Sequence, residues 1–527
     1  MTQLARAVWC GSVALVFGAC GDSGGATGSA SAATTLPVTS ETGSSSEPTT
    51  SASASGSTSA SGSEGGTQGT TAEPTTATSS GPKFDLPAGG DVGVPPPSCS
   101  VVDDMDAVGD CTDKAAPDAF EPEVQWTFMG PAGFEECIVT PLVANLTDDN
   151  ADGKIDLCDV PDVVVVAGPN AGSDTPPARL YVLDGATGTE HFYAAEPVQW
   201  GATPALGDID SDGIPEIVSV EPGAAGRLIA FEHDGSVKWK SDVPWAGAQA
   251  SAIALADLDQ DGDVEIVAGA QVFDHNGVQL WEKGSNAIYS ASAVSDLDGA
   301  PGLEVLVGGA AFHADGSQWY DTGIFGWVQP QVANLDDDAQ PEVLLASDAA
   351  IHLFEHDGTP VWSFAPNGQG DLSRPINIHD FDGDTKAEFG ISAPNFYGVY
   401  ESDKTPLWEA MVTDQSGQAG GTAFDFIGGG KAQAIYADEL TVWVYDDKGQ
   451  VLMNTPHRSG TIIEYPTVAD IDNDGSSEIL VVSNTLLVGG PLPFTVQAVR
   501  DVQDRWVQGR RIWNQHTYHI TNTVVVS

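Results

Sequence analysis

The amino-acid sequence predicts an all-β protein, a β-propeller of eight four-stranded blades preceded by a disordered linker, with seven blades as the alternative. Three observations predict this fold. One acidic phrase occurs eight times in the 527-residue chain. Each copy stands among short β-rich segments, and tryptophans recur soon after the tight polar turns between them. The 60 Gly and 33 Pro imply many turns, which favours β-structure over long helices.

The N-terminal residues 1–20 are typical of an export signal. Arg6 supplies a positive charge, an apolar stretch follows, and small residues precede Cys20. The segment resembles a bacterial lipoprotein signal peptide, which implies lipidation of Cys20; an ordinary secretory signal is the alternative. We therefore expect an exported lipoprotein of the outer membrane or cell surface, or a secreted protein if it is not lipidated. The membrane is expected as a partner only through this anchor.

Residues 21–98 consist mainly of Ser, Thr, Gly and Ala, with hardly any aromatic side chain. Such a segment cannot bury enough apolar surface to offset its conformational entropy, so we predict a disordered linker. Residues 99–120 form a lead-in at the start of the folded part, and residues 121–527 form the propeller.

Four cysteines lie close to this lead-in: Cys99, Cys111, Cys137 and Cys158. In an exported protein this pattern favours two disulfides, and the predicted pairs are nearest neighbours, Cys99 with Cys111 and Cys137 with Cys158. A zinc site is the alternative, but nearby His residues and CxxC spacing are lacking.

The acidic phrases begin at Asp148, Asp208, Asp257, Asp296, Asn334, Asp380, Asp425 and Asp470. Their starts lie 38 to 60 residues apart, which suits a four-stranded blade. A short apolar strand precedes most phrases and a β-rich strand follows. A third strand then runs into an Asp-Gly or Asn-Gly hairpin turn and a fourth strand. The segment around Trp126 resembles such a fourth strand, and we expect it to close the ring in the last blade.

Acidic residues at positions 1, 3 and 5 of a phrase, a glycine at position 6 and a carboxylate at position 9 would form an oxygen cage that suits Ca²⁺. Acidic turns without an ion are the alternative. The phrases from Asp148, Asp208, Asp257 and Asp470 are complete, whereas Ala339 and Thr385 replace the glycine in those from Asn334 and Asp380. Ala300 removes a ligand from the Asp296 copy, and the Asp425 copy is predicted to be metal-free. The predicted calcium ligands are Asp148, Asn150, Asp152, Asp156, Asp208, Asp210, Asp212, Glu216, Asp257, Asp259, Asp261, Glu265, Asn334, Asp336, Asp338, Glu342, Asp380, Asp382, Asp384, Glu388, Asp470, Asp472, Asp474 and Glu478.

The phrase and the strand after it resemble the FG-GAP and VCBS repeats of bacterial secreted proteins and of the integrin α-subunit head. The resemblance covers roughly residues 120–527 and implies a propeller whose loops bind calcium structurally. The repeats here are shorter than the integrin form and usually carry Glu at position 9.

The C-terminal segment is rich in basic and aromatic residues in an otherwise acidic protein, including Arg510, Arg511, Trp513 and His516. One interpretation is a corner that binds or transforms an acidic or sugar ligand. The other is packing of the ring closure, with the arginines paired to neighbouring carboxylates.

The formal net charge of −56 argues against nucleic acid as a partner, because phosphate binding needs a basic surface. No catalytic residue is predicted. We expect a calcium-stabilised, surface-displayed module that binds protein or glycan ligands in adhesion. The enzyme alternative is a polysaccharide lyase, because some rhamnogalacturonan lyases resemble this design; a quinone-dependent dehydrogenase is a weaker alternative.

Overall fold

The computed structural model describes residues 115–518, except 117–118, 171–175, 286, 290, 337, 339, 348–349, 367–371 and 373–374. These residues belong to one compact unit, Thr78–Ser527, whereas the unit Met1–Ala77 lies outside the described residues. The signal peptide, Cys20 and the linker predicted above therefore also lie outside them. Within the described part, no helix is long and apolar enough to cross a membrane.

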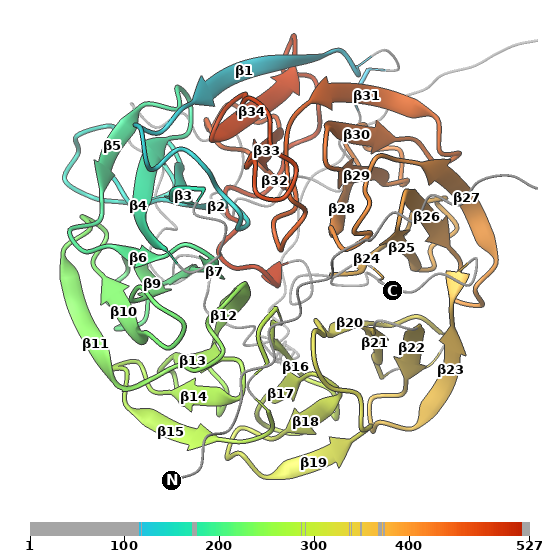
Figure 1. Ribbon diagram of the computed structural model, residues 1–527, viewed down its shortest axis with the longest axis horizontal. Coiled ribbons are helices and arrows are strands. Elements are labelled where there is room, and N and C mark those ends of the chain that lie inside the picture. The colour runs from blue at the N-terminus through green and yellow to red at the C-terminus, as the bar shows by residue number, and fades with distance from the viewer. Residues whose placement is uncertain are drawn as a thin grey trace, which may run out of the picture. The chain divides into compact units, whose positions relative to one another are not determined.

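Eight sheets are arranged in a ring, and each contains four strands that pair antiparallel (Figure 1). The prediction of eight blades is confirmed, and the seven-bladed alternative is wrong. The first strand of each blade lies nearest the ring axis: β2 (Leu142–Ala144), β8 (Ala205–Gly207), β12 (Ser251–Ala256), β16 (Ala293–Ser295), β20 (Gln331–Ala333), β24 (Asn377–His379), β28 (Gly421–Phe424) and β32 (Thr467–Ala469). The second strands are β3 (Asp162–Ala167), β9 (Glu216–Val220), β13 (Glu265–Ala268), β17 (Glu304–Val307), β21 (Glu342–Ala346), β25 (Glu388–Ala393), β29 (Gln433–Ala437) and β33 (Glu478–Val482).

The third and fourth strands lie progressively farther from the axis. The third strands are β4 (Pro177–Asp184), β10 (Arg227–Phe231), β14 (Gln271–Phe273), β18 (Ala310–Phe312), β22 (Ile351–Phe354), β26 (Phe396–Tyr400), β30 (Thr441–Tyr445) and β34 (Val496–Asp501). The fourth strands are β5 (Glu190–Tyr193), β11 (Val237–Pro244), β15 (Gln279–Glu282), β19 (Gln318–Asp321), β23 (Pro360–Phe364), β27 (Pro406–Met411), β31 (Val451–Pro456) and β1 (Pro122–Phe128). Two short strands, β6 (Val198–Gln199) and β7 (Ala202–Thr203), extend blades one and three by pairing with β4 and β12.

Burial follows this order of strands. The second strand β3 has the sequence DVVVVA and is buried along its whole length, as an apolar strand covered on both faces should be. The fourth strand β15 alternates between intermediate and exposed residues, because only one of its faces meets the protein. The core therefore lies between neighbouring blades, at their first three strands.

The ring is closed by the N-terminal strand. β1 pairs antiparallel with β34, so blade eight contains both the first and the last strand of the fold (Figure 1). The predicted role of the Trp126 segment is thereby confirmed. Because this pairing covers the edge of β34, the last sheet is as complete as its neighbours.

An aromatic side chain on the fourth strand packs against the hairpin of the next blade. A Cβ added to Gly188 would lie 2.4 Å from the Trp126 ring, and one added to Gly277 would lie 2.6 Å from Trp239. Both glycines have positive φ, 68° and 76°. The Asp-Gly and Asn-Gly turns thus serve two needs, a left-handed backbone and room for the neighbouring ring. This packing explains why an aromatic residue recurs on most fourth strands, with Phe192 and Tyr320 in this place in blades one and four.

One predicted disulfide pair is wrong. Cys158 is disulfide-bonded, but Cys137 is a buried free thiol whose Sγ donates to the carbonyl of Val139 at 3.3 Å. Cys137 lies at the junction of blades eight and one, where its amide donates to Ser483 O at 3.0 Å, whereas Cys158 lies in the long loop before β3. Cys99 and Cys111 lie outside the described residues. Burial raises the pKa of the Cys137 thiol to about 12.

Candidate metal-binding loops

Each acidic phrase forms the loop between the first and second strands of a blade, and we name each loop by the residue that begins the phrase. In six of the loops, the Glu at position 9 is the first residue of the second strand and accepts a hydrogen bond from the backbone amide at position 2. Examples are Glu216 with Ile209 at 2.9 Å and Glu478 with Ile471 at 3.0 Å. One oxygen of this carboxylate therefore holds the loop, which leaves the other oxygen for a second partner.

The carboxylate at position 1 organises the turn. Asp208 accepts from the amides of Asp212 and Gly213, both at 3.0 Å, and Gly213 has a φ of 96°. In the Asp380 loop Thr385 adopts this left-handed conformation with a φ of 73° and still donates to Asp380 at 2.9 Å. The loop geometry thus persists without glycine, at the cost of backbone strain.

Several loop carboxylates have a buried oxygen without a hydrogen-bond partner. These oxygens are Asp257 Oδ1, Glu342 Oε1, Glu388 Oε1, Asp470 Oδ1, Asp472 Oδ1 and Glu478 Oε1. An ionised carboxylate that is buried and unpaired is strongly unfavourable, so these oxygens fit a cation as their missing partner. In the Asp380 loop, oxygens of Asp380, Asp382, Asp384 and Glu388 all lie within 4.8 Å of one another, close enough for one metal ion.

Burial also changes the acidity of these groups. It raises the pKa of Glu265 and Glu342 to about 7 and that of Glu388 to about 8, with neighbouring loop carboxylates raising it further. Burial likewise raises the pKa of Asp470 to about 7, although the positive charge of Arg511 acts in the opposite direction. Carboxyls that resist ionisation in a cluster of like charge are the groups that a divalent cation would return to the ionised form.

The first loop differs from its predicted form. Ala144 pairs with Asp162, whereas Gly207 pairs with Glu216, so the loop of blade one is roughly twice as long as that of blade two. Asp162, not Asp156, takes the place of the position-9 Glu, because it accepts from the amide of Leu146 at 2.8 Å.

A separate twelve-residue loop, 148–159, lies within this insertion. Asp148 accepts from Asp152 and Gly153 as in the other loops, but the carboxylate that closes the loop is Asp159, which accepts from the amides of Asp149 and Asp156. Asp159 is 1% exposed. It occupies position 12, where an EF-hand loop carries its last ligand, and that spacing could have identified it from the sequence.

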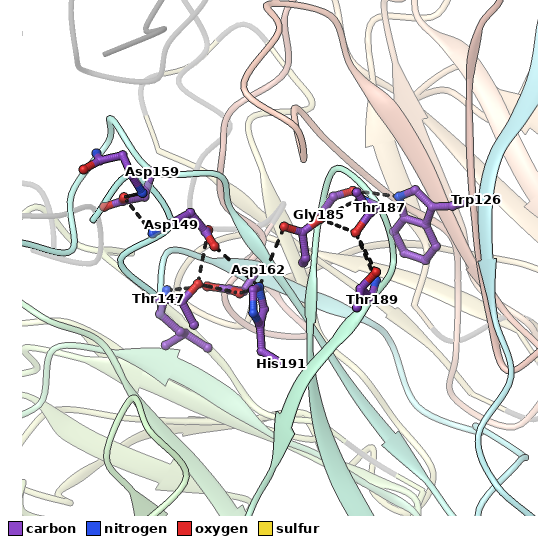
Figure 2. Close-up of polar contacts among 12 residues, drawn as sticks. Trp126, Thr147, Asp149, Asp159, Asp162, Gly185, Thr187, Thr189 and His191 are labelled. Carbon is purple, nitrogen blue, oxygen red and sulfur yellow. Dashed lines mark hydrogen bonds and ion pairs between the residues drawn. The ribbon is translucent and has the colours of Figure 1, made fainter. Parts of the chain in front are cut away.

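A second cluster in blade one also escaped the sequence prediction. Figure 2 shows His191, on β5, beside the carboxylates of Asp149 and Asp162. Its Nε2 lies 3.7 Å from Asp149 Oδ1, 3.4 Å from Asp162 Oδ1 and 3.9 Å from Asp184 Oδ2. Asp162 is fully buried, and burial raises its pKa to about 8.

In several blades, the residue that begins the hairpin between the third and fourth strands also approaches the loop. The pKa of Glu355 is raised by burial and then by Asp336 and Asp338, and His313 Nδ1 lies 3.1 Å from Glu304 Oε1. The sequence contains a signal for these residues, because an acidic residue or His recurs at the start of this hairpin. The corresponding residues are Asp184, Glu232, Asp274, His313, Glu355, Glu401 and Asp446.

The Asp425 loop, predicted to be metal-free, keeps the backbone of the others with an amide in place of a carboxylate. Gln433 Oε1 accepts from the amide of Phe426 at 2.9 Å, and Asp425 accepts from Gly429 and Gly430. Blade seven therefore forms although its phrase has lost most of the acids.

The C-terminal segment packs inside the ring. Trp513 forms a bridge with Val143 of β2, and Leu255 of β12 donates to Gln515 Oε1 at 2.8 Å. Arg511 is 2% exposed and donates to Leu157 O at 2.6 Å, and His516 is fully buried with its Nε2 3.3 Å from Ile463 O. Arg510 is half-buried, and its carbonyl accepts from the Asp470 amide. Of the two interpretations of this corner, the geometry favours packing of the ring closure.

Fold and loops together define the class: an eight-bladed β-propeller with repeated acidic loops. Residues 208–268 match the sequence model of the FG-GAP-like repeat family. No curated protein matches the chain.

Among solved structures, the chain is similar to the Vibrio cholerae biofilm matrix protein Bap1, with a TM-score of 0.65, 19% identity and coverage of 75% of this chain and 94% of that one. The exotype rhamnogalacturonan lyase YesX gives a TM-score of 0.49 at 14% identity, over 73% of this chain and 75% of that one. At these identities the likeness to Bap1 shows the fold alone.

Proposed function

We propose that the protein is a calcium-stabilised propeller that binds a protein or glycan ligand in adhesion. The observation that carries this proposal is the contrast between the two faces of the ring. One face, the loop face, carries the acidic loops and the hairpins between third and fourth strands. The opposite face, the connection face, carries the connections between second and third strands and from one blade to the next.

The most exposed large apolar side chains belong to the connection face. Phe325, in the connection from β19 to β20, is 80% exposed, and Leu487, between β33 and β34, is 83% exposed. Met411, at the end of β27, is 79% exposed. The connections 322–330 and 483–495 contain no charged residue. Exposed apolar groups in connections that have no charged residue of their own favour ligand binding there, while the acidic loop face keeps the molecule soluble.

An aromatic pair strengthens this assignment. Trp327, 41% exposed, lies 4.7 Å from Tyr289 between ring centroids, and each comes from a connection between blades. Together with Phe325 they place three aromatic side chains in the connections that flank blade four. The similarity to a biofilm matrix protein supports an adhesive role without identifying a ligand.

Calcium is the proposed ion because all ligands in these loops are hard oxygen donors. The residues that would hold it are those of the Asp257, Asn334, Asp380 and Asp470 loops, and Asp148, Asn150, Asp152, Asp156 and Asp159 in blade one. The ion would supply charge neutralisation and a link between the ends of first and second strands. It would therefore stabilise the folded ring without itself contacting the ligand.

A glycan array tests the binding proposal, with pectic and bacterial polysaccharides as probes. We expect retained signal on at least one probe, and an at least tenfold loss in Phe325→Ser. Leu280→Ser is the matched control, because Leu280 is also exposed, at 53%, but lies on an outer strand. Equal loss in both variants, or none in Phe325→Ser, would contradict binding on the connection face. Ultraviolet absorbance of unsaturated sugar products from the same probes tests the lyase alternative.

We also propose export by residues 1–20 and anchoring through a lipid on Cys20, which would display the ring at the outer membrane or cell surface. Globomycin, which inhibits lipoprotein signal peptidase, should block maturation. A mature protein that forms normally in its presence would instead indicate secretion.

A further inference from the structure

The Asp208 loop already contains a cation that belongs to the protein. Lys238 Nζ lies 2.5 Å from Asp210 Oδ2, 3.1 Å from Glu216 Oε1 and 3.2 Å from Glu232 Oε2. Asp210 and Glu216 hold positions 3 and 9 of the loop, and Glu232 begins the adjacent hairpin. The ammonium group therefore contacts two of the four carboxylates that a metal ion in this loop would use.

A β-bulge places Lys238 there. On β11, Trp239 pairs with Ala230 and Val237 pairs with Phe231, so Lys238 is the extra residue between two paired ones. Bulges re-aim side chains, and every fourth strand has one at the same place. The bulge residues are Gln125, His191, Lys238, Leu280, Trp319, Val361, Leu407 and Leu452. Among them only Lys238 carries a permanent positive charge.

The loops also differ in whether all of their carboxylate oxygens have a hydrogen-bond partner. In the Asp208 loop, Glu216 Oε2 accepts from the Ile209 amide and Oε1 from Lys238, so both oxygens are satisfied. In the Asp257, Asn334, Asp380 and Asp470 loops, at least one buried carboxylate oxygen has no partner. The bulge residues of those four blades are Leu280, Val361, Leu407 and Gln125, none of which is a cation.

We propose that Lys238 is a built-in cation that takes the place of the metal ion in the Asp208 loop, so that this loop binds no calcium although its acidic phrase is complete. An ammonium group held by three carboxylates neutralises them, and it repels a divalent ion at the same place. The inference rests on the proposed calcium binding of the other loops. It adds that the outer strand of each blade, and not the acidic phrase alone, decides whether the loop takes a metal.

A reciprocal exchange between neighbouring blades tests this inference. Lys238→Leu removes the cation from blade two, and Leu280→Lys adds one at the equivalent bulge of blade three. Equilibrium dialysis of the purified full-length protein against radioactive calcium counts the ions bound at saturation. We expect Lys238→Leu to bind one ion more than the unmodified protein and Leu280→Lys one ion fewer. The double exchange should return to the original count.

Two further variants keep the test decisive if Lys238→Leu fails to fold. Lys240→Met removes a lysine of the same strand that pairs with Glu221 at 2.8 Å, away from the loop, and should leave the count unchanged. Asp210→Asn should also leave it unchanged, because the Asp208 loop holds no ion to lose. A count that falls by one in Asp210→Asn, or that stays the same in Lys238→Leu, would overturn the inference. A protein that binds no calcium in any form would instead refute the proposed calcium binding, together with this inference.

Discussion

Blades two and three have nearly the same acidic phrase, DIDSDGIPE and DLDQDGDVE, yet their loops have different surroundings. In blade two the bulge residue is Lys238, and both oxygens of Glu216 are satisfied by the protein. In blade three the bulge residue is Leu280, and Asp257 Oδ1 is buried without a partner. Asp208 Oδ1, the counterpart of Asp257 Oδ1, accepts from the Asp212 amide, so the part that Lys238 plays in blade two is to pair with Asp210 and Glu216. One residue on a strand that is distant in sequence from the phrase thus gives blade two a cation that blade three lacks at the equivalent bulge. Equal motifs do not imply equal occupancy, because charge balance is set by every element that packs against the loop.

Removal of calcium by a chelator should have the largest effect on the free energy of unfolding. Each occupied loop contributes about 2.7 kcal/mol when free calcium is one hundred times its dissociation constant, so the five proposed loops together contribute on the order of 10 kcal/mol. Thermal unfolding in excess calcium and in EDTA measures this contribution. The calcium-dependent shift should grow in Lys238→Leu and shrink in Leu280→Lys. An unfolding curve that EDTA does not move would remove the basis for distinguishing the two blades.

Matched substitutions at position 3 should have a smaller effect. Asp259→Asn in blade three should lose up to about 2.7 kcal/mol in calcium and little in EDTA, because the loss is that of the ion. Asp210→Asn in blade two should lose about 1 kcal/mol in both media, because it breaks only an ion pair with Lys238. Denaturant unfolding of both variants, in calcium and in EDTA, measures these four changes in the free energy of unfolding. Equal calcium dependence of the two variants would show that the loops behave alike.

The pH dependence of stability should change sign with calcium. Without the ion, burial raises the pKa of Glu265 and Glu342 from 4.5 to about 7 and that of Glu388 to about 8. The folded state then binds protons more tightly than the unfolded chain. Its extra stability is fully present below pH 4.5 and is lost as pH rises through 7 to 8. The melting temperature in EDTA should therefore fall between pH 5 and 8.

With calcium present, protons compete with the ion for the same carboxylates, so calcium stabilisation should increase over the same pH range. Melting temperatures measured at a series of pH values, with and without calcium, compare the two slopes. Parallel slopes would mean that these carboxyls are not the calcium ligands.

The smallest effect is expected at the bulge of blade eight. Gln125 Nε2 donates to Asp472 Oδ2 at 2.7 Å, so this bulge residue contacts its loop through a neutral amide. Gln125→Leu should cost about 1 kcal/mol, the usual net value of a hydrogen bond, and leave the calcium count unchanged. Gln125→Lys is the matching variant that adds a cation at this bulge, and it should lower the number of bound calcium ions by one. A lysine here that leaves the count unchanged would confine the effect to blade two.

The sequence alone predicted the fold because its evidence is local and repeated. An acidic phrase between two apolar strands, followed by an Asp-Gly or Asn-Gly hairpin, specifies a blade through turn geometry and burial, and eight copies specify a ring. The closing role of the Trp126 strand followed from counting strands. The sequence also allowed most candidate ligands to be proposed, because positions 1, 3, 5 and 9 lie within one short phrase.

Other features depended on contacts between segments far apart in the chain. Spacing alone predicts Asp156 at position 9, because it does not reveal the insertion before Asp162. It also pairs Cys137 with Cys158, although Cys137 lies in the core and Cys158 in a loop. The C-terminal arginine-rich segment contained no periodic signal, so only its contacts with β2 and β12 show that it packs inside the ring.

The acidic sequence by itself determined that this protein is a propeller with repeated carboxylate loops, because turns, strand patterning and ligand spacing are short-range properties. Only the tertiary structure decided which of those loops are already neutralised. Charge compensation depends on distances of a few ångströms, and the bulge that brings Lys238 to Asp210 and Glu216 forms between strands whose pairing the acidic phrase does not encode.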